Sequence, residues 1–223
     1  MNHNRAFEII YESLVGLQRQ KAKPIRVAIN GIEGTGKTTF SKGLVSYLQS
    51  KSVTAINVSI DGFHFNKEHR YRQGRDSVIG YYEDSYDEVG FVDKVLLSSQ
   101  KEPAYYISAT HDLESDLYVD LEPVKIPNNA VLVTDGAYLF KQPYRDHWDL
   151  KIYLKTNYET ALKRGAKRDR ENLGGMEGAI QKFNDRYHKA SKLYIKKNSP
   201  ETIADLVIDN TDFENLKIIK KNL

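Results

Sequence analysis

The sequence contains no cysteine among its 223 residues. Disulfide bonds, thiol catalysis and cysteine-ligated zinc are therefore excluded. Long apolar runs are also absent, because no stretch approaches the ~20 residues that a membrane-spanning helix needs. The first residues lack the basic segment and the continuous apolar run of a secretory signal. We therefore expect a cytoplasmic protein that does not insert into a membrane.

An excess of charge of one sign is missing as well. The formal net charge is +3, and the basic residues are scattered along the chain rather than clustered as in a dedicated nucleic-acid binder. This balance suits an anionic small-molecule substrate and does not favour nucleic acid as a partner. With 40% apolar and 28% charged residues, the chain is typical of one globular domain over 1–223. A homo-oligomer is compatible with these features.

The apolar periodicity predicts an α/β architecture. An amphipathic helix is expected over 5–21, within an N-terminal helical segment 1–22, and a second helix over 37–48. Five short apolar runs predict parallel strands at 25–29, 53–60, 130–134, 151–154 and 204–208. The alternating residues of 104–125 predict a β-hairpin inserted beside the site. The polar loop 62–84 is long enough to carry function.

A glycine-rich turn lies between the first expected strand and the second expected helix. Its sequence GIEGTGKT matches the pattern GxxxxGK[ST], in which backbone amides cradle phosphates and the lysine neutralises the β- and γ-phosphates. The threonine hydroxyl at the start of the helix can ligate Mg²⁺. An idle glycine turn is the structural alternative. We expect the nucleotide to contact Gly31, Glu33, Gly34, Thr35, Gly36, Lys37, Thr38 and Thr39.

Two aspartates follow expected strands. Asp61 follows the second strand and Asp135 the third, so both should stand at the carboxyl edge of the sheet, where ligands bind in open α/β folds. We assign Asp135 to the orientation of Mg²⁺. Asp61 is assigned as the general base toward the attacking hydroxyl, with a further contact to the metal shell. Each aspartate could instead be a helix cap or a turn former.

Several ordered segments carry a resemblance to a known family. They are GIEGTGKTT, SIDGFHFNKEHRYRQG, GYYEDSYD, VTDGAYLF, RDHWDLKIYLK, KRGAKRDR and ADLVIDN. The chain resembles the uridine kinase, phosphoribulokinase and pantothenate kinase branch of the P-loop kinases, especially bacterial uridine kinase-like proteins. The resemblance implies a three-layer fold with a five-stranded parallel sheet and the inserted hairpin. It also implies an Mg²⁺-dependent kinase that uses ATP or GTP.

The resemblance further implies roles for charged and aromatic residues. Arg164 and Arg168 would lie in a lid, within 157–190 together with the following helix, and would balance charge on the transferring phosphoryl group. A solvated basic helix face is the alternative for this segment. The acceptor would lie among Phe63, His64, Arg70, Tyr82, Tyr105 and His111, whose aromatic faces could stack on a base. Each of these side chains could instead be a packing residue or a surface group.

Two departures from the uridine-cytidine kinase pattern concern the acceptor. Tyr81 replaces an aspartate that contacts ribose in those kinases, and Arg186 with Tyr187 replaces a glutamine-tyrosine pair. Arg186 therefore joins the candidate substrate-binding residues. Its positive charge makes an acidic or phosphorylated substrate plausible.

Transfer of the γ-phosphoryl group to a nucleoside such as uridine or cytidine is the leading hypothesis. The same chemistry on pantothenate, a sugar or a phosphosugar is the first alternative, and Arg186 favours it. A nucleotide-dependent ATPase or switch belongs to a different class, and the guanine-reading motif NKxD is absent. A nucleic-acid end kinase or RNA-binding protein is a further alternative, which salt-dependent retention on RNA would reveal.

Overall fold

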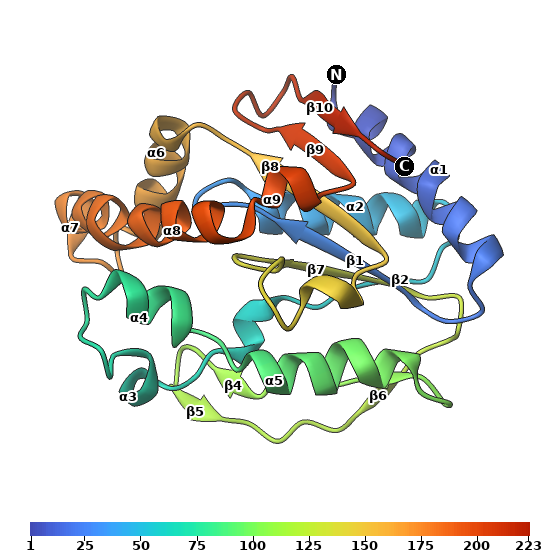
Figure 1. Ribbon diagram of the computed structural model, residues 1–223, viewed down its shortest axis with the longest axis horizontal. Helices are drawn as coiled ribbons and strands as arrows, with labels where there is room; N and C mark the ends of the chain where they lie inside the picture. The colour runs from blue at the N-terminus through green and yellow to red at the C-terminus, as the bar shows by residue number, and fades with distance from the viewer.

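The computed structural model describes all residues from Met1 to Leu223, and a six-stranded sheet forms its centre (Figure 1). The strand order is β10-β9-β8-β1-β7-β2. The strands are β1 (Ile25–Asn30), β2 (Ala55–Asn57), β7 (Val131–Gly136), β8 (Leu150–Lys155), β9 (Leu206–Asp209) and β10 (Lys217–Lys221). All neighbours from β2 to β9 run parallel, and β10 is antiparallel to β9. The expected five-stranded parallel sheet is confirmed, and β10 is an additional edge strand.

Helices cover both faces of this sheet and so produce three layers (Figure 1). Val27 and Ile29 of β1 pack in one core with Ile10 of α1 (His3–Gln20) and Leu44 of α2 (Lys37–Ser50). Ala28 belongs to the core on the opposite face, because successive strand residues point to opposite sides. The apolar residues of β1 therefore face both cores, as in a strand that is buried on two faces.

The remaining helical elements of the chain are mostly short. They are η1 (Ile60–Phe63), α3 (Lys67–Arg70), α4 (Val78–Glu83), α5 (Glu88–Phe91), η2 (Val92–Leu97), η3 (Ser98–Gln100), η4 (Arg145–His147), α6 (Tyr158–Asp169), α7 (Gly175–Lys182), η5 (Phe183–Tyr187), α8 (His188–Asn198) and α9 (Pro200–Ile203). Of these, η2 and η5 are π-helical turns that interrupt longer helical segments. No helix combines the length and the apolar content that crossing a bilayer requires.

Two segments differ in detail from the sequence expectation. The second strand is shorter than 53–60, because the chain leaves the sheet after Asn57 and turns into the 3-10 helix η1. The Ser59 hydroxyl accepts a hydrogen bond from the Asp61 amide and so caps this turn. The segment 104–125 forms a hairpin whose ladder is broken into two pairs, β3 (Tyr105–Tyr106) with β6 (Val124–Lys125) and β4 (His111–Asp112) with β5 (Leu117–Tyr118).

The carboxyl ends of the parallel strands meet at one edge of the sheet. The glycine-rich turn follows β1, η1 follows β2, and α6 follows β8. Asp135 is paired with Ile29 near the end of β7. Segments far apart in the sequence therefore converge where the strand order places β7 and β8 on opposite sides of β1.

Candidate functional site

The glycine-rich turn is held in a shape that only glycine permits at two positions. Gly34 and Gly36 have φ values of +83° and +93°. A Cβ on Gly34 would stand 2.0 Å from the carbonyl oxygen of Ala161. The Asn210 side chain donates a hydrogen bond of 2.7 Å to the Thr35 carbonyl and anchors the turn from β9. The cradle is thus closely packed against the start of α6, with its concave side left to a ligand.

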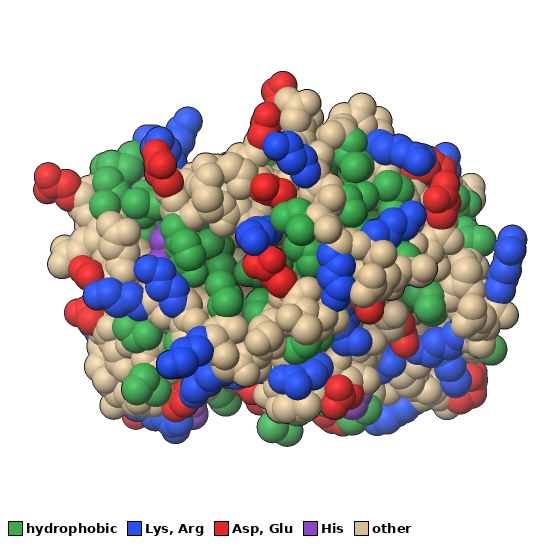
Figure 2. All heavy atoms as spheres, turned by 45° about the horizontal axis from the view of Figure 1, so that its top comes forward, with side chains coloured by type: hydrophobic (Ala, Val, Ile, Leu, Met, Phe, Trp, Pro, Cys, Tyr) green, Lys and Arg blue, Asp and Glu red, His purple; other side chains and the backbone are tan.

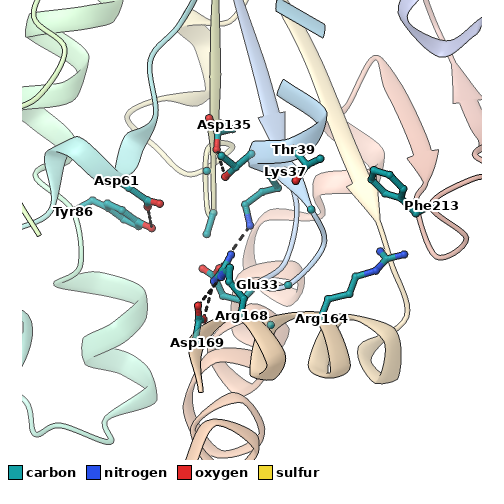
Figure 3. Close-up of a pocket in the computed structure, with 16 residues that line it drawn as sticks. Glu33, Lys37, Thr39, Asp61, Tyr86, Asp135, Arg164, Arg168, Asp169 and Phe213 are labelled. Carbon is teal, nitrogen blue, oxygen red and sulfur yellow. Dashed lines mark hydrogen bonds and ion pairs between the residues drawn. The ribbon is translucent and has the colours of Figure 1, made fainter. Parts of the chain in front are cut away.

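Lys37 begins α2 and points into the cradle (Figure 3). Its ammonium group donates to the Ile32 carbonyl at 3.0 Å and lies 3.7 Å from Oε2 of Glu33. Burial acts to raise the pKa of Glu33, but the charges of Lys37 and Arg168 and the hydroxyl of Tyr81 outweigh it and hold that pKa below its usual range. Glu33 is therefore an anion that balances the positive charge of Lys37, a role that the phosphates of a bound nucleotide would take over.

Asp135 lies beside the first turn of α2. Its Oδ2 accepts from the Thr38 hydroxyl at 2.7 Å, and its Oδ1 accepts from the Ser41 hydroxyl at 3.1 Å and from the Asn57 amide at 3.0 Å. The pair Thr38–Asp135 offers only oxygen donors next to the phosphate cradle, which is the chemistry that Mg²⁺ prefers. No group of three acidic or histidine side chains forms a cage here. The Thr38–Asp135 pair fits Mg²⁺, which keeps several waters and binds through one or two protein oxygens plus phosphates.

Asp61 lies in η1 and faces Asp135 and Lys37 across the cleft (Figure 3). The Tyr86 hydroxyl donates to its Oδ1 at 3.3 Å, and the His64 ring contacts its carbonyl at 2.9 Å. The carboxylate is open to the cleft, yet protein surrounds the cleft on its other sides. This burial raises the pKa of Asp61, and the negative charges of Glu33 and Asp135 add to the rise against the opposing effects of His64 and Lys37.

The cleft has two connected chambers that share five lining residues, Glu33, Asp61, Tyr86, Arg168 and Asp169. The larger chamber, of about 600 Å³, extends along the glycine-rich turn to Phe213. We call it the donor chamber. The smaller chamber, of about 230 Å³, extends from Asp61 toward α4 and η5, and we call it the acceptor chamber. A group bound in one chamber can therefore meet a group bound in the other next to Asp61.

Three of the expected substrate-binding residues line the acceptor chamber. They are His64, Arg70 and Arg186. Four tyrosines also line it: Tyr81 and Tyr187, which stand at the acceptor positions where the sequence departs from the uridine-cytidine kinases, and Tyr71 and Tyr86, which the sequence analysis had not assigned. Burial lowers the pKa of His64, although the charge of Asp61 opposes that shift. The Tyr81 hydroxyl donates to Glu33 at 2.9 Å and so connects this chamber to the glycine-rich turn.

The other four expected substrate-binding residues are not brought to this chamber. Phe63 is fully buried and packs edge-on against Phe91, with ring centres 5.0 Å apart. Tyr82 lies on the buried side of α4, where its hydroxyl accepts from Asn198. Tyr105 is paired in the hairpin ladder with Lys125. His111 has a buried side chain that lies behind Arg70, 3.3 Å from Asp116. None of these four residues lines either chamber.

The two lid arginines point to different ends of the cleft (Figure 3). Arg168 lies at the junction of the chambers, where it forms two hydrogen bonds with Asp169, of 2.6 and 2.8 Å. Arg164 instead donates to the carbonyls of Asn210 and Thr211 and stands beside Phe213. The structure therefore does not bring Arg164 to the reacting end, where the sequence analysis had expected both arginines.

Phe213 is a lining residue that the sequence reasoning missed. It is 42% exposed at the far end of the donor chamber, beside Arg164. The His3 ring of α1 packs behind it, with ring centres 4.4 Å apart. An exposed aromatic face held from behind offers a stacking surface for a nucleobase. No sequence motif marks it, because it stands in the connection between β9 and β10.

Comparison with known proteins adds a family match. The sequence model of the phosphoribulokinase / uridine kinase family matches residues 26–216. A uridine kinase from Leuconostoc citreum is 28% identical over 215 residues, which cover 90% of this chain and 99% of that relative. A signal recognition particle 54 kDa protein from Methanothermobacter thermautotrophicus is 29% identical over 144 residues; they cover 58% of this chain, which spans only 33% of that relative. The solved structure of a possible uridine kinase from Bacillus stearothermophilus shares the fold, with a TM-score of 0.66, 20% identity and coverage of 89% and 98% of the two chains.

Proposed function

This chain belongs to the phosphoribulokinase / uridine kinase family, and from that membership we propose how its two-chambered cleft transfers a phosphoryl group. Members of the family are kinases, so the chain is a phosphotransferase with an alcohol acceptor. We propose that ATP or GTP binds in the donor chamber. The acceptor then presents its hydroxyl from the acceptor chamber. The observation that carries this proposal is the position of Asp61 at the junction of the chambers.

The donor is held by groups that oppose its negative charge. Backbone amides of residues 31–36 and the helix start at Lys37 face the phosphates, and the glycines leave the room that a Cβ would fill. Thr38 and Asp135 would hold Mg²⁺, either directly or through water. When bound there, Mg²⁺ would neutralise the negative charge that develops on the phosphates during transfer. Phe213 and Arg164 stand where the base of the donor would lie.

The reaction is an in-line displacement at the γ-phosphorus. Asp61 accepts the proton of the acceptor hydroxyl as the bond between that oxygen and phosphorus forms. The bond from phosphorus to the bridging oxygen breaks, and the nucleoside diphosphate leaves with the electron pair. The Tyr86 hydroxyl keeps the Asp61 carboxylate oriented. Lys37 and Arg168 face the transferring group and stabilise its charge.

Two classes of acceptor are compatible with the acceptor chamber. A nucleoside such as uridine is favoured by the name of the relative that spans nearly the whole chain, and by the tyrosine rings on which a base can stack. Another small alcohol is favoured by the size of the acceptor chamber, because about 230 Å³ lies below the ~300 Å³ at which drug-sized pockets begin. Arg70 and Arg186 in its wall also favour the second class.

The face of the molecule shown in Figure 2 offers no support for nucleic acid as the acceptor. On the face shown in Figure 2, lysine and arginine side chains are interspersed with acidic ones, and no continuous basic stripe crosses that face. A nucleic-acid backbone would require clustered positive charge.

A screen of acceptors tests the proposed function. Release of ADP or GDP is followed in a coupled assay with Mg²⁺ and each donor, across nucleosides, pantothenate, sugars and sugar phosphates. We expect release that depends on one acceptor class and is lost in the Asp61→Asn variant. Release that is independent of every acceptor and unchanged in that variant would show a nucleotide hydrolase instead.

A further inference from the structure

Arg186 is a buried cation in the wall of the acceptor chamber. It is only 3% exposed and lies in the π-helical turn η5, between α7 and α8. Its guanidinium carbon lies 5.0 Å from the ring centre of Tyr71 and 4.8 Å from that of Tyr81. Two aromatic rings therefore fix the plane of the guanidinium group. Single π-helical turns within longer helices occur frequently at functional sites.

Apart from Asp61 and His64, each of the other charged residues that line the chamber forms a salt bridge. Glu33 faces Lys37 at 3.7 Å, and Asp169 is bound by Arg168 at 2.6 Å. Arg70 is bound to Asp116 at 3.1 Å. Arg186 forms no salt bridge, and its one hydrogen bond within the protein is a long one of 3.4 Å, from Nε to the Ser77 carbonyl.

A buried arginine without an anionic partner is uncommon, because removal of a charge from water is costly unless an opposite charge compensates. Arg186 lines the same chamber as Asp61. Arg70 lies near Arg186, because its guanidinium carbon is 5.8 Å from the centre of the same Tyr71 ring. The Nε of Arg70 is buried and has no hydrogen-bond partner. Two guanidinium groups thus line one small chamber, and that of Arg186 has no anionic partner within the protein.

We propose that the phosphoryl acceptor carries an anionic group, a carboxylate or a phosphate, which binds Arg186 with support from Arg70. This inference rests on the proposed function and names the class of its acceptor. The planar fork of a guanidinium group matches both anions through two parallel hydrogen bonds. The acceptor is then a small bifunctional molecule with its hydroxyl at Asp61 and its anion at Arg186. A neutral nucleoside lacks the second group.

Binding measured by calorimetry tests this inference without requiring turnover. The donor chamber is first saturated with Mg²⁺ and a non-hydrolysable ATP analogue, AMPPNP. The protein is then titrated with two matched pairs of probes, D-glycerate with glycerol and ribose 5-phosphate with ribose, and with uridine. The first pair tests a carboxylate and the second a phosphate. We expect at least one anionic probe to bind about 10-fold or more tightly than its neutral partner, as a charge-assisted hydrogen bond provides.

Substitutions assign the preference to Arg186. Arg186→Gln should abolish the difference between the members of the pair, and Arg186→Lys should keep part of it, because an ammonium group retains the charge but not the fork. Lys189→Gln is the matched control, since Lys189 pairs with Asp185 on the exposed side of the same helical segment. It should leave the preference unchanged.

The possible results separate the two proposals. If AMPPNP itself does not bind, the proposed function fails. If AMPPNP binds but neither anionic probe does, or if uridine or the neutral probes bind as tightly as the anionic ones, the anion inference is wrong. It is also wrong if an anionic preference survives Arg186→Gln in folded protein. If that variant does not fold, an equal preference in wild type and Arg186→Lys would overturn the role of the fork.

Discussion

Replacement of Asp61 by asparagine isolates the proton-accepting role that the structure suggests. The asparagine amide has the same shape, and its oxygen can still accept the hydrogen bond from Tyr86, now 3.3 Å long. The negative charges of Glu33 and Asp135 oppose ionisation of Asp61, so the neutral amide is not expected to weaken folding or donor binding. What disappears is the acceptor for the hydroxyl proton. A general base contributes roughly 10²- to 10⁴-fold, which corresponds to about 3–5 kcal/mol of barrier.

The assay compares kcat from coupled ADP release with the Kd of the donor from calorimetry. We expect kcat to fall by about 100-fold or more, while the Kd of the donor stays equal or decreases. Asp93→Asn serves as the matched control, because Asp93 is exposed on η2 outside both chambers. A kcat within about threefold of wild type would refute the role of Asp61 as general base. A proportional loss of donor affinity would instead indicate a binding role.

Three further outcomes follow from the geometry. The raised pKa of Asp61 means that its basic form is lost at a higher pH than for an ordinary aspartate, so kcat/KM should fall with decreasing pH already above about pH 4; a profile flat to that pH would contradict this. Gly34→Ala should strongly weaken donor binding in calorimetry, because its Cβ would stand 2.0 Å from the Ala161 carbonyl oxygen at a φ of +83°. Wild-type affinity in this variant would show that the glycine-rich turn does not hold the phosphates. Phe213→Ala should raise the KM for the donor about 10-fold with little change in kcat, because only the stacking surface is removed. An unchanged KM would show that the base of the donor does not stack on Phe213.

The sequence predicted the site best for residues that lie at the carboxyl ends of the parallel strands. The turn before Lys37 follows β1, Asp61 comes after β2, and Asp135 lies near the end of β7. Parallel strands bring their carboxyl ends to one edge of the sheet. These positions therefore required no knowledge of the distant packing. Asn57 and Ser41, which hold the Asp135 carboxylate, could not be found in this way, because their contact depends on how β2 and α2 approach β7.

The acceptor side was predicted less well for a physical reason. Residues 60–100 fold into short helical pieces, and a short piece has too few residues for periodicity to show which side is buried. Tyr81 lines the acceptor chamber, whereas the adjacent Tyr82 points into the core. Arg164 and Arg168 share one face of α6, but four residues advance about 6 Å along a helix. That displacement separates the base end of the donor chamber from its reacting end.

The central claim is that the glycine-rich turn with Lys37 binds a nucleoside triphosphate next to Asp61. Calorimetric titration of the purified protein with Mg²⁺ and non-hydrolysable analogues of ATP and GTP tests this claim most directly. The account predicts saturable binding of at least one analogue at a single site, lost in the Lys37→Ala variant. Absence of binding for both analogues, or equal binding by wild type and Lys37→Ala, would contradict it.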